Sequence, residues 1–301
     1  MTQHHPTLND VVDTFHSLYP PHLAESWDAS GLIAGRGERT VQKILFAVDA
    51  VSATAEEAVR EEAQLLITHH PLLLKGANFI PAQEYKGAVL HTLIENKVGL
   101  LAAHTNADSA VDGVNEAIAD LLRLRDVQIL ADEQIQERDG SQHTVGLGRV
   151  GRLEQPLSLR ELAQSLAEIL PATTGGLRIA GDPEMKVERV ALCGGAGDSL
   201  FDELRASDAD VYVTADLRHH PASELRERAL VEGTGRPALI DCSHFASEWL
   251  WLNRGAQTLQ QALAERGFQV ECEVSTLNTD PWDFHVSTGS VSGSVSTTGL
   301  V

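Results

Sequence analysis

The 301-residue chain has little cysteine. Its three cysteines, Cys193, Cys242 and Cys272, lie far apart and form no CxxC pair. This spacing argues against a disulfide framework and against a zinc site made of thiolates, and it fits a reducing cytoplasm. Cys242 follows an apolar run, where it is either a small buried residue or a nucleophile.

Long apolar runs are also absent. No stretch reaches the roughly 18–20 apolar residues that a membrane span requires, and the start, MTQHHPTLNDVV, lacks the basic and apolar parts of a secretory signal. We therefore expect a cytoplasmic protein with no membrane partner. Aromatic residues make up only 5% of a chain that is 43% hydrophobic, which predicts an aliphatic core and excludes wholesale disorder.

Positive charge is scarce as well. Lys and Arg number 23 against 43 Asp and Glu, so the formal net charge is −20. Such a charge repels phosphate backbones and argues against a nucleic-acid partner. Histidine, by contrast, occurs 13 times.

Apolar runs alternate with helical patterns in the first part of the chain. Strands are expected at residues 43–50, 64–70 and 98–104, and helices at 52–63, 84–96 and 111–122. Because the apolar runs are continuous, they indicate a largely parallel sheet covered on both faces.

The α/β pattern weakens and then restarts after about residue 125. We predict two three-layer α/β lobes with parallel or mixed sheets and a metal site in the cleft between them. The first lobe comprises residues 1–125, and a helix near 244–267 packs back on it. The second comprises 126–275, with a polar surface loop at 131–142, and 276–301 form a low-complexity, disordered tail.

Histidines and carboxylates follow several predicted strands. The tandem His69-His70 ends one strand, His104 ends the next, and His244 closely follows a third. In open α/β sheets, ligands bind beyond the carboxyl ends of the strands. We therefore expect these side chains to converge on one rim.

The spacing of these residues favours metal ions. Neighbouring residues of an extended chain point in opposite directions, so His69 and His70 can serve two different ions. His244 and Glu248 are four residues apart and share one face of a helix, and His104 and Asp108 have the same spacing. A single strand-end histidine is usually a hydrogen-bonded structural residue, but three such groups together predict a nitrogen and oxygen site for Zn, Mn, Fe, Co or Ni.

Two other features allow several interpretations. The tandem His219-His220 is a metal site, a substrate or second-layer contact, or part of a solvated face. The turn Gly194–Gly197 before a helix either binds an anion with its backbone N–H groups or is a plain tight turn.

Four motifs, spread over most of the chain, resemble the GTP cyclohydrolase I type 2 family, also called the Nif-three-like family of dinuclear metal-centre proteins. They are Thr68-His69-His70-Pro71, His104-Thr105-Asn106-Ala107-Asp108, Thr214-Ala215-Asp216 and Ser243-His244-Phe245-Ala246-Ser247-Glu248. The resemblance implies two-lobed α/β subunits that assemble into toroidal hexamers. It also implies that His70 and Asp108 bind one divalent ion, that His69 and His244 bind the other, that Glu248 bridges them, and that His104 is an additional ligand or a near neighbour.

Two functions are consistent with these residues. The first is a metal-dependent hydrolase in which activated water attacks a purine nucleotide or a phosphoester, with His104 or His220 carrying protons. A nucleotide or another phosphate-containing small molecule is then the expected partner, beside further copies of the chain. The alternative is a non-catalytic metal-binding protein, such as a metal chaperone, store or regulator.

Overall fold

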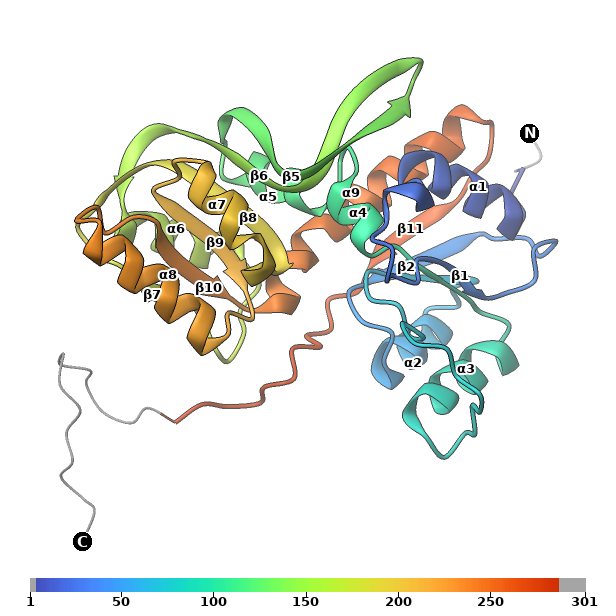
Figure 1. Cartoon of the computed structure of the whole chain (residues 1–301). Coiled ribbons are helices and arrows are strands. Elements are labelled where there is room, and N and C mark those ends of the chain that lie inside the picture. The colour runs from blue at the N-terminus through green and yellow to red at the C-terminus, as the bar shows by residue number, and fades with distance from the viewer. Residues whose placement is uncertain (1–3, 287–301) are drawn as a thin grey trace, which may run out of the picture.

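A computed structural model describes residues 4–286, and the Val-, Ser-, Thr- and Gly-rich residues 287–301 of the predicted tail lie outside that range. Two β-sheets with covering helices form two lobes (Figure 1). This is the two-lobed α/β architecture that the sequence predicts. No helix within the described residues is both long and apolar enough to cross a membrane.

The sheet of the first lobe has five strands in the order β1-β4-β3-β2-β11. Its strands are β1 (Gly31–Ala34), β2 (Lys43–Ala47), β3 (Leu65–Thr68), β4 (Gly99–Ala102) and β11 (Glu271–Val274). The four strands β4, β3, β2 and β11 are parallel, and β1 pairs antiparallel with β4. The parallel register brings the carboxyl ends of β2, β3 and β4 to one edge.

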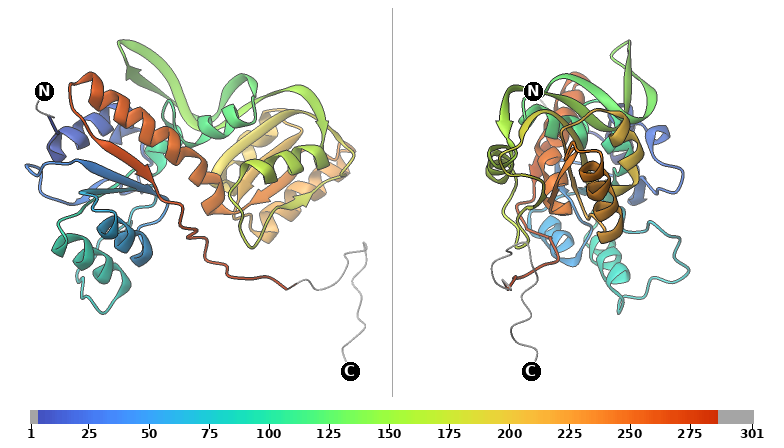
Figure 2. Two further views of the ribbon diagram at one scale, coloured as in Figure 1. Left: turned by 180° about the vertical axis from the view of Figure 1, so that it is seen from behind. Right: turned by 60° about the vertical axis from the view of Figure 1, so that its left-hand side comes forward.

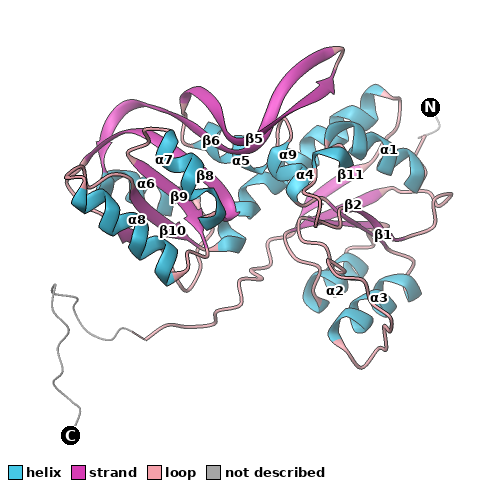
Figure 3. Cartoon of the chain, viewed as in Figure 1, coloured by secondary structure: helices cyan, strands magenta, loops and turns pink. Residues whose placement is uncertain are grey.

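Both faces of this sheet are covered, which explains its continuous apolar strands. Leu45 and Leu66 pack toward α2 (Ser52–Arg60) and α3 (Tyr85–Glu95), whereas Ile44 and Phe46 pack toward α1 (Leu8–Leu18) and α9 (His244–Glu265). Figures 1 and 3 show these two helical layers on opposite sides of the sheet. The short helices η1 (Pro21–Leu23), α4 (Thr105–Ser109) and α5 (Val114–Leu121) continue the lobe toward the second sheet.

The sheet of the second lobe has six strands in the order β5-β6-β8-β9-β10-β7. They are β5 (Arg125–Arg138), β6 (Ser141–Ser158), β7 (Arg178–Ala180), β8 (Lys186–Ala196), β9 (Val211–Ala215) and β10 (Ala238–Cys242). The central strands β8, β9 and β10 are parallel. Helices η2 (Asp198–Leu200), α7 (Phe201–Ala206) and α8 (His219–Val231) lie on one face, and α6 (Leu159–Ile169) lies on the other (Figure 2).

The 22-residue helix α9 joins the lobes. It packs against β8 and β9 of the second sheet and against β2 and β11 of the first. The sequence had placed the final strand, within 126–275, in the second lobe. In the structure β11 pairs with β2 instead, because α9 carries the chain from the end of β10 back to the first sheet.

The prediction of a surface loop at residues 131–142 is wrong. Those residues belong to a long antiparallel hairpin of β5 and β6, whose turn is Asp139-Gly140. Both turn residues have positive φ, 52° and 75°, as a tight two-residue hairpin requires. Most of β5 is exposed, so it lacks the apolar run by which the other strands could be recognised.

Candidate metal centre

The predicted rim forms where the two lobes meet. Asp49 follows β2, the pair His69-His70 follows β3, and His104 follows β4, so the parallel order of the first sheet places all three groups at one edge. His244 is the first residue of α9, directly after β10 and Ser243. Side chains of both lobes therefore line one cleft, of about 850 Å³.

Glu248 lies at the centre of this group and is 2% exposed. One of its oxygens, Oε1, is 2.9 Å from His244 Nε2 and 3.3 Å from His69 Nε2. The other, Oε2, is 3.0 Å from His70 Nε2. Because His244 and Glu248 lie one helical turn apart on α9, the helix presents both toward the histidines of the first lobe.

His69 and Asp108 complete the buried part of the site. His69 is fully buried, and its Nε2 lies 3.7 Å from Oδ1 of Asp108, a residue of α4. Neither ring nitrogen of His69, nor Asp108 Oδ1, has a hydrogen-bond partner among the described residues. Leaving such atoms buried and unpaired costs about 1–3 kcal/mol for each group, so these atoms indicate a ligand.

Three carboxylates hold the other histidines by their Nδ1 atoms. Asp49 Oδ1 is 2.7 Å from Nδ1 of His70, and Asp216 Oδ2 is 2.8 Å from Nδ1 of His244. Asp28 Oδ1 is likewise 2.8 Å from Nδ1 of His104. A carboxylate at Nδ1 places the proton there and leaves Nε2 free as a ligand, which is the usual arrangement of a metal-binding histidine.

The residues present fit divalent ions. Two ligands of one ion with bonds of about 2 Å and tetrahedral angles lie roughly 3.3 Å apart. The Nε2 atoms of His70 and His244 are 3.2 Å apart. The contacts that Glu248 and Asp108 make with histidine Nε2 atoms range from 2.9 to 3.7 Å. Two groups of residues could each hold an ion, because the ligand atoms within each group lie within 4.8 Å of one another. One group is His70, His244 and Glu248, and the other is His69, His70 and His104.

Without bound cations, His70 and His244 favour their protonated forms. Burial disfavours the charged imidazoles, but the Glu248 carboxylate outweighs it and raises the pKa of His70 to about 11 and of His244 to about 10. Burial acts against the Glu248 carboxylate too, yet the surrounding histidines keep its pKa well below the usual value. For Asp108, burial and the Glu248 charge act together and raise the pKa to about 7.

The division of ligands between ions stays a prediction. The resemblance pairs His70 with Asp108 and His69 with His244, whereas the structure groups His70 with His244 around Glu248. His104, predicted to be catalytic or an additional ligand, lies beside His69 and His70, with ring centroids 5.3 and 5.6 Å away. Its position fits both roles.

His220, also predicted to carry protons, lies elsewhere. It is the second residue of α8, after His219, and is not among the described residues that line the cleft. Cys242 is buried, donates to the carbonyl oxygen of Thr214 and has a pKa raised to about 12 by burial. Its thiol is therefore a poor nucleophile.

Neither interpretation of Gly194–Gly197, as an anion-binding turn or as a plain tight turn, is correct, because β8 extends to Ala196. Gly194 and Gly195 lie within β8, and their N–H groups donate to Asn115 Oδ1 and Ser247 Oγ. A Cβ on Gly195 would stand 2.5 Å from Glu248 Oε1 and 3.3 Å from His244 Nε2. The glycine thus makes room for the central carboxylate.

Sequence reasoning missed the roles of Asp28, Asp49 and Asp216. Asp49 and Asp216 follow the ends of β2 and β9 by two residues and one residue, so the strand-end signal that identified the histidines applies to them as well. Asp28 lies in a loop, and its oxygens also accept hydrogen bonds from the backbone and hydroxyl of Thr105. Within the described residues no strand precedes Asp28, so the strand-end signal does not identify it.

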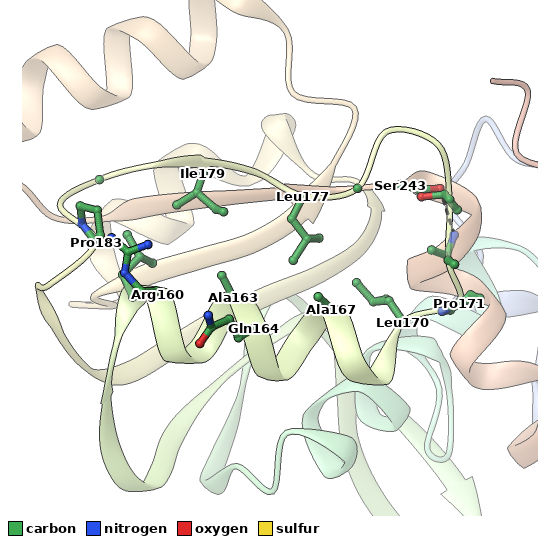
Figure 4. A pocket seen from close by; sticks show the side chains of 16 residues that line it. Arg160, Ala163, Gln164, Ala167, Leu170, Pro171, Leu177, Ile179, Pro183 and Ser243 are labelled. Atoms are coloured by element: carbon green, nitrogen blue, oxygen red, sulfur yellow. Dashed lines mark hydrogen bonds between the residues drawn. The ribbon is translucent and has the colours of Figure 1, made fainter. Parts of the chain in front are cut away.

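A second cavity, of about 450 Å³, lies between α6 and the segment that leads through β7 (Figure 4). It meets the metal cleft at Gly176 and Ser243, which line both. Its walls are mostly aliphatic, including Ala163, Leu170 and Leu177. Such a lining offers few groups for chemistry, so the metal cleft remains the candidate site.

The fold and the site define a two-lobed α/β protein with a histidine–carboxylate cluster suited to metal ions. Residues 6–281 match the family model of Duf34/NIF3 (NGG1p interacting factor 3). The chain belongs to the DUF34/NIF3 family.

Several relatives carry the name "GTP cyclohydrolase 1 type 2 homolog". The one from Streptomyces coelicolor is 45% identical over 290 residues, which cover 96% of this chain and 98% of the relative. The one from Mycobacterium tuberculosis is 33% identical over 382 residues, which cover 94% of this chain and 98% of the relative. The resemblance deduced from the four motifs is therefore confirmed.

Solved structures show the same fold. The Staphylococcus aureus protein SA1388 is 25% identical, with a TM-score of 0.80 over 93% of this chain and 99% of that one. A Bacillus cereus protein related to NIF3 also has a TM-score of 0.80, at 23% identity over 93% of this chain and 99% of that one. These likenesses support the two-lobed architecture.

Proposed function

We propose that this protein is a metal-dependent hydrolase with two divalent ions in each subunit. The observation that carries the proposal is the convergence of imidazole nitrogens from both lobes on the buried carboxylate of Glu248, in an open cleft. His69, His70, Asp108, His244 and Glu248 would hold the ions. When bound, such ions supply Lewis-acid activation of water and of a substrate oxygen at neutral pH.

The residues of the chain divide the remaining work. Glu248, with two oxygens directed at different histidines, can contact both cations and offset their mutual repulsion. Asp49 and Asp216 fix the imidazoles of His70 and His244. His104 lines the cleft and has its Nδ1 on Asp28, so its Nε2 is free to bind a cation or to accept a proton from the reacting water.

A purine nucleotide or a phosphoester is the substrate class that we propose. Among the described residues that line the cleft, Arg178 is the single Arg or Lys, and its Nε donates to Asp241 at 2.7 Å. With this guanidinium already paired, the cations would have to supply most of the attraction for a phosphate group. Less charged purine compounds therefore belong in any substrate test.

The test is turnover by protein loaded with Mn or Zn. GTP, a purine nucleoside and a set of phosphodiesters are incubated with the loaded protein, the metal-free protein and the Glu248→Gln variant. The proposal requires a product that forms only with the loaded wild type. Tight binding of two ions with no turnover of any compound would instead favour the alternative, a metal chaperone, store or regulator.

We also propose that the chain forms a hexamer, as the family resemblance implies. Large apolar side chains on the first lobe are exposed, among them Phe79 at 84% and Tyr85 at 62%. Contacts between subunits would cover such groups. Light scattering should give a mass near six times 32.5 kDa, and a mass near 32.5 kDa would reject the assembly.

A further inference from the structure

The chain does not end at the last strand of the first lobe. After β11, residues 275–286, here called the C-terminal strap, leave the first lobe and extend beside the second (Figures 1 and 2). Six residues of the strap line the metal cleft: Thr279, Asp280, Pro281, Trp282, Phe284 and His285. The part that was predicted to belong to a disordered tail therefore forms a wall of the candidate site.

The strap is attached to both lobes before it reaches the cleft. Ser275 is buried, its hydroxyl bonds to the carboxylate of Glu57, and its carbonyl oxygen accepts from Trp249 Nε1 at 3.1 Å. Three residues later, Asn278 Nδ2 donates to the carbonyl oxygen of Ala172 in the second lobe, also at 3.1 Å. These contacts fix the path of the two residues that follow.

Thr279 reaches His70 through Asp49. Its hydroxyl donates to Asp49 Oδ2, while Asp49 Oδ1 faces Nδ1 of His70 at 2.7 Å. A carboxylate that is held at both oxygens has one orientation. Thr279 thereby restricts the rotation of Asp49 and, through it, of the His70 imidazole, whose Nε2 faces Glu248.

Asp280 reaches α9 through Ser243. The Ser243 hydroxyl donates to Asp280 Oδ1 at 2.6 Å, and the same oxygen of Ser243 accepts from the Ala246 N–H at 3.2 Å as the cap of the helix. Donation to Asp280 directs the hydroxyl proton away from the helix and leaves a lone pair for the cap. The capped turn begins with His244, and Glu248 follows one turn later.

We propose that the C-terminal strap is a positioning element of the metal centre, and that docking of the strap and binding of metal strengthen each other. Thr279 acts on His70 through Asp49, and Asp280 acts on the first turn of α9, which carries His244, through Ser243. If the docked strap favours metal binding, then bound metal must favour the docked strap by the same factor. This inference rests on the proposed metal centre but not on hydrolysis.

The test uses Co²⁺, which reports both affinity and ligand geometry. Metal-free wild type and Thr279→Val are titrated with Co²⁺ while the visible absorption bands are recorded. Valine keeps the shape of threonine and loses the hydroxyl, so we expect roughly tenfold weaker binding and altered bands. Thr279→Ser, which restores the hydroxyl, should return both toward wild type.

A matched control separates loss of the Thr279 contact from the substitution itself. Thr276→Val makes the same change at an exposed strap residue whose hydroxyl has no hydrogen bond among the described residues, so its Co²⁺ bands should match those of wild type. Asp280→Ala should weaken binding as Thr279→Val does. Hydrogen exchange of residues 276–285 should slow when wild type is loaded with Co²⁺, and less so in Thr279→Val.

The outcomes are distinct. If Thr279→Val and Asp280→Ala both bind Co²⁺ with wild-type affinity and bands, or if loading leaves the exchange of the strap unchanged, the strap has no positioning role. Wild type that binds Co²⁺ with these linked effects but hydrolyses nothing supports this inference and overturns only the hydrolase. Wild type that binds no Co²⁺ overturns both.

Discussion

His70 of the first lobe and His244 of the second face each other with their Nε2 atoms 3.2 Å apart. Each ring has its Nδ1 on a carboxylate, so the atoms that meet are the two free nitrogens. Two such lone pairs repel unless a cation lies between them, or unless protons on them face Glu248. The same geometry therefore couples metal binding, protonation and the packing of the lobes.

Glu248→Gln should lower the occupancy of both ions together. The substitution keeps the size of the side chain but removes the charge and one strong metal-binding oxygen, at a position that contacts histidines from both groups. Asp108→Asn should mainly empty one position, because His69 is the one described histidine with a ring nitrogen within 4.0 Å of the Asp108 carboxylate. The measurement is metal per subunit by elemental analysis after dialysis.

Two results would contradict this assignment. Glu248→Gln that retains two ions as tightly as wild type would show that Glu248 does not bridge. Wild type that holds at most one ion would show that the site is not dinuclear, and that the tandem His69-His70 serves a single ion or a structural role.

Metal affinity should rise with pH. With pKa values of about 11 and 10, His70 and His244 are both protonated near pH 7 in the metal-free protein, and each must release a proton to bind a cation. We expect the logarithm of the affinity to rise by about two for each pH unit between pH 7 and 9. Below pH 7 the slope steepens, because Asp108, whose pKa is about 7, takes up a third proton.

The folding stability of the metal-free chain should change in the opposite direction and fall as the pH rises. Raised histidine pKa values mean that the folded state binds more protons than the unfolded state above the unfolded value near 6.5. This stabilisation is complete below that value and is lost as the pH rises toward 10 and 11. Thermal unfolding of metal-free wild type should show the loss, and Glu248→Gln, which lacks the charge behind the shifts, should show much less.

Gly195→Ala should lower metal binding, because it adds a collision with Glu248 to the backbone strain of a positive φ. Both Gly195 and Gly233 have positive φ, 68° and 72°, so an alanine at either costs about 1–2 kcal/mol in strain. Only at Gly195 would the new Cβ collide with Glu248, since Gly233 has no atom within 4 Å of that position. Metal content should fall in Gly195→Ala and stay at the wild-type level in Gly233→Ala; equal metal content in the two variants would contradict this role.

The main layers of the fold could be predicted from the sequence because buried parallel strands leave continuous apolar runs. The histidines could be predicted because each group follows such a run or lies one helical turn from a carboxylate. The β5 strand could not be predicted in this way, since an exposed ribbon needs few apolar residues. Its Asp139-Gly140 turn was the signal that could have revealed it.

Contacts between distant segments were not predictable from patterns. Nothing in the residues around Gly195 indicates that a helix 50 residues later brings a carboxylate against it. The link from Thr279 to Asp49 joins residues 230 positions apart, and Thr279 lies in the part of the chain that was predicted to be a disordered tail. Such features arise when α9 returns the chain to the first lobe, and they follow from tertiary packing rather than from local preference.

Asp216→Asn should weaken metal binding without removing a ligand. Asp216 accepts from Nδ1–H of His244 at 2.8 Å, and this hydrogen bond lowers the pKa of the carboxylate. An asparagine can accept the same hydrogen bond but carries no charge, so the imidazole becomes a poorer donor to a cation, and affinity should fall by about 10- to 100-fold. Competition with a chelator measures the change in wild type and variant. Asp202→Asn, on the exposed face of α7, is the control. Equal affinities in Asp216→Asn and wild type would mean that His244 needs no carboxylate to orient it.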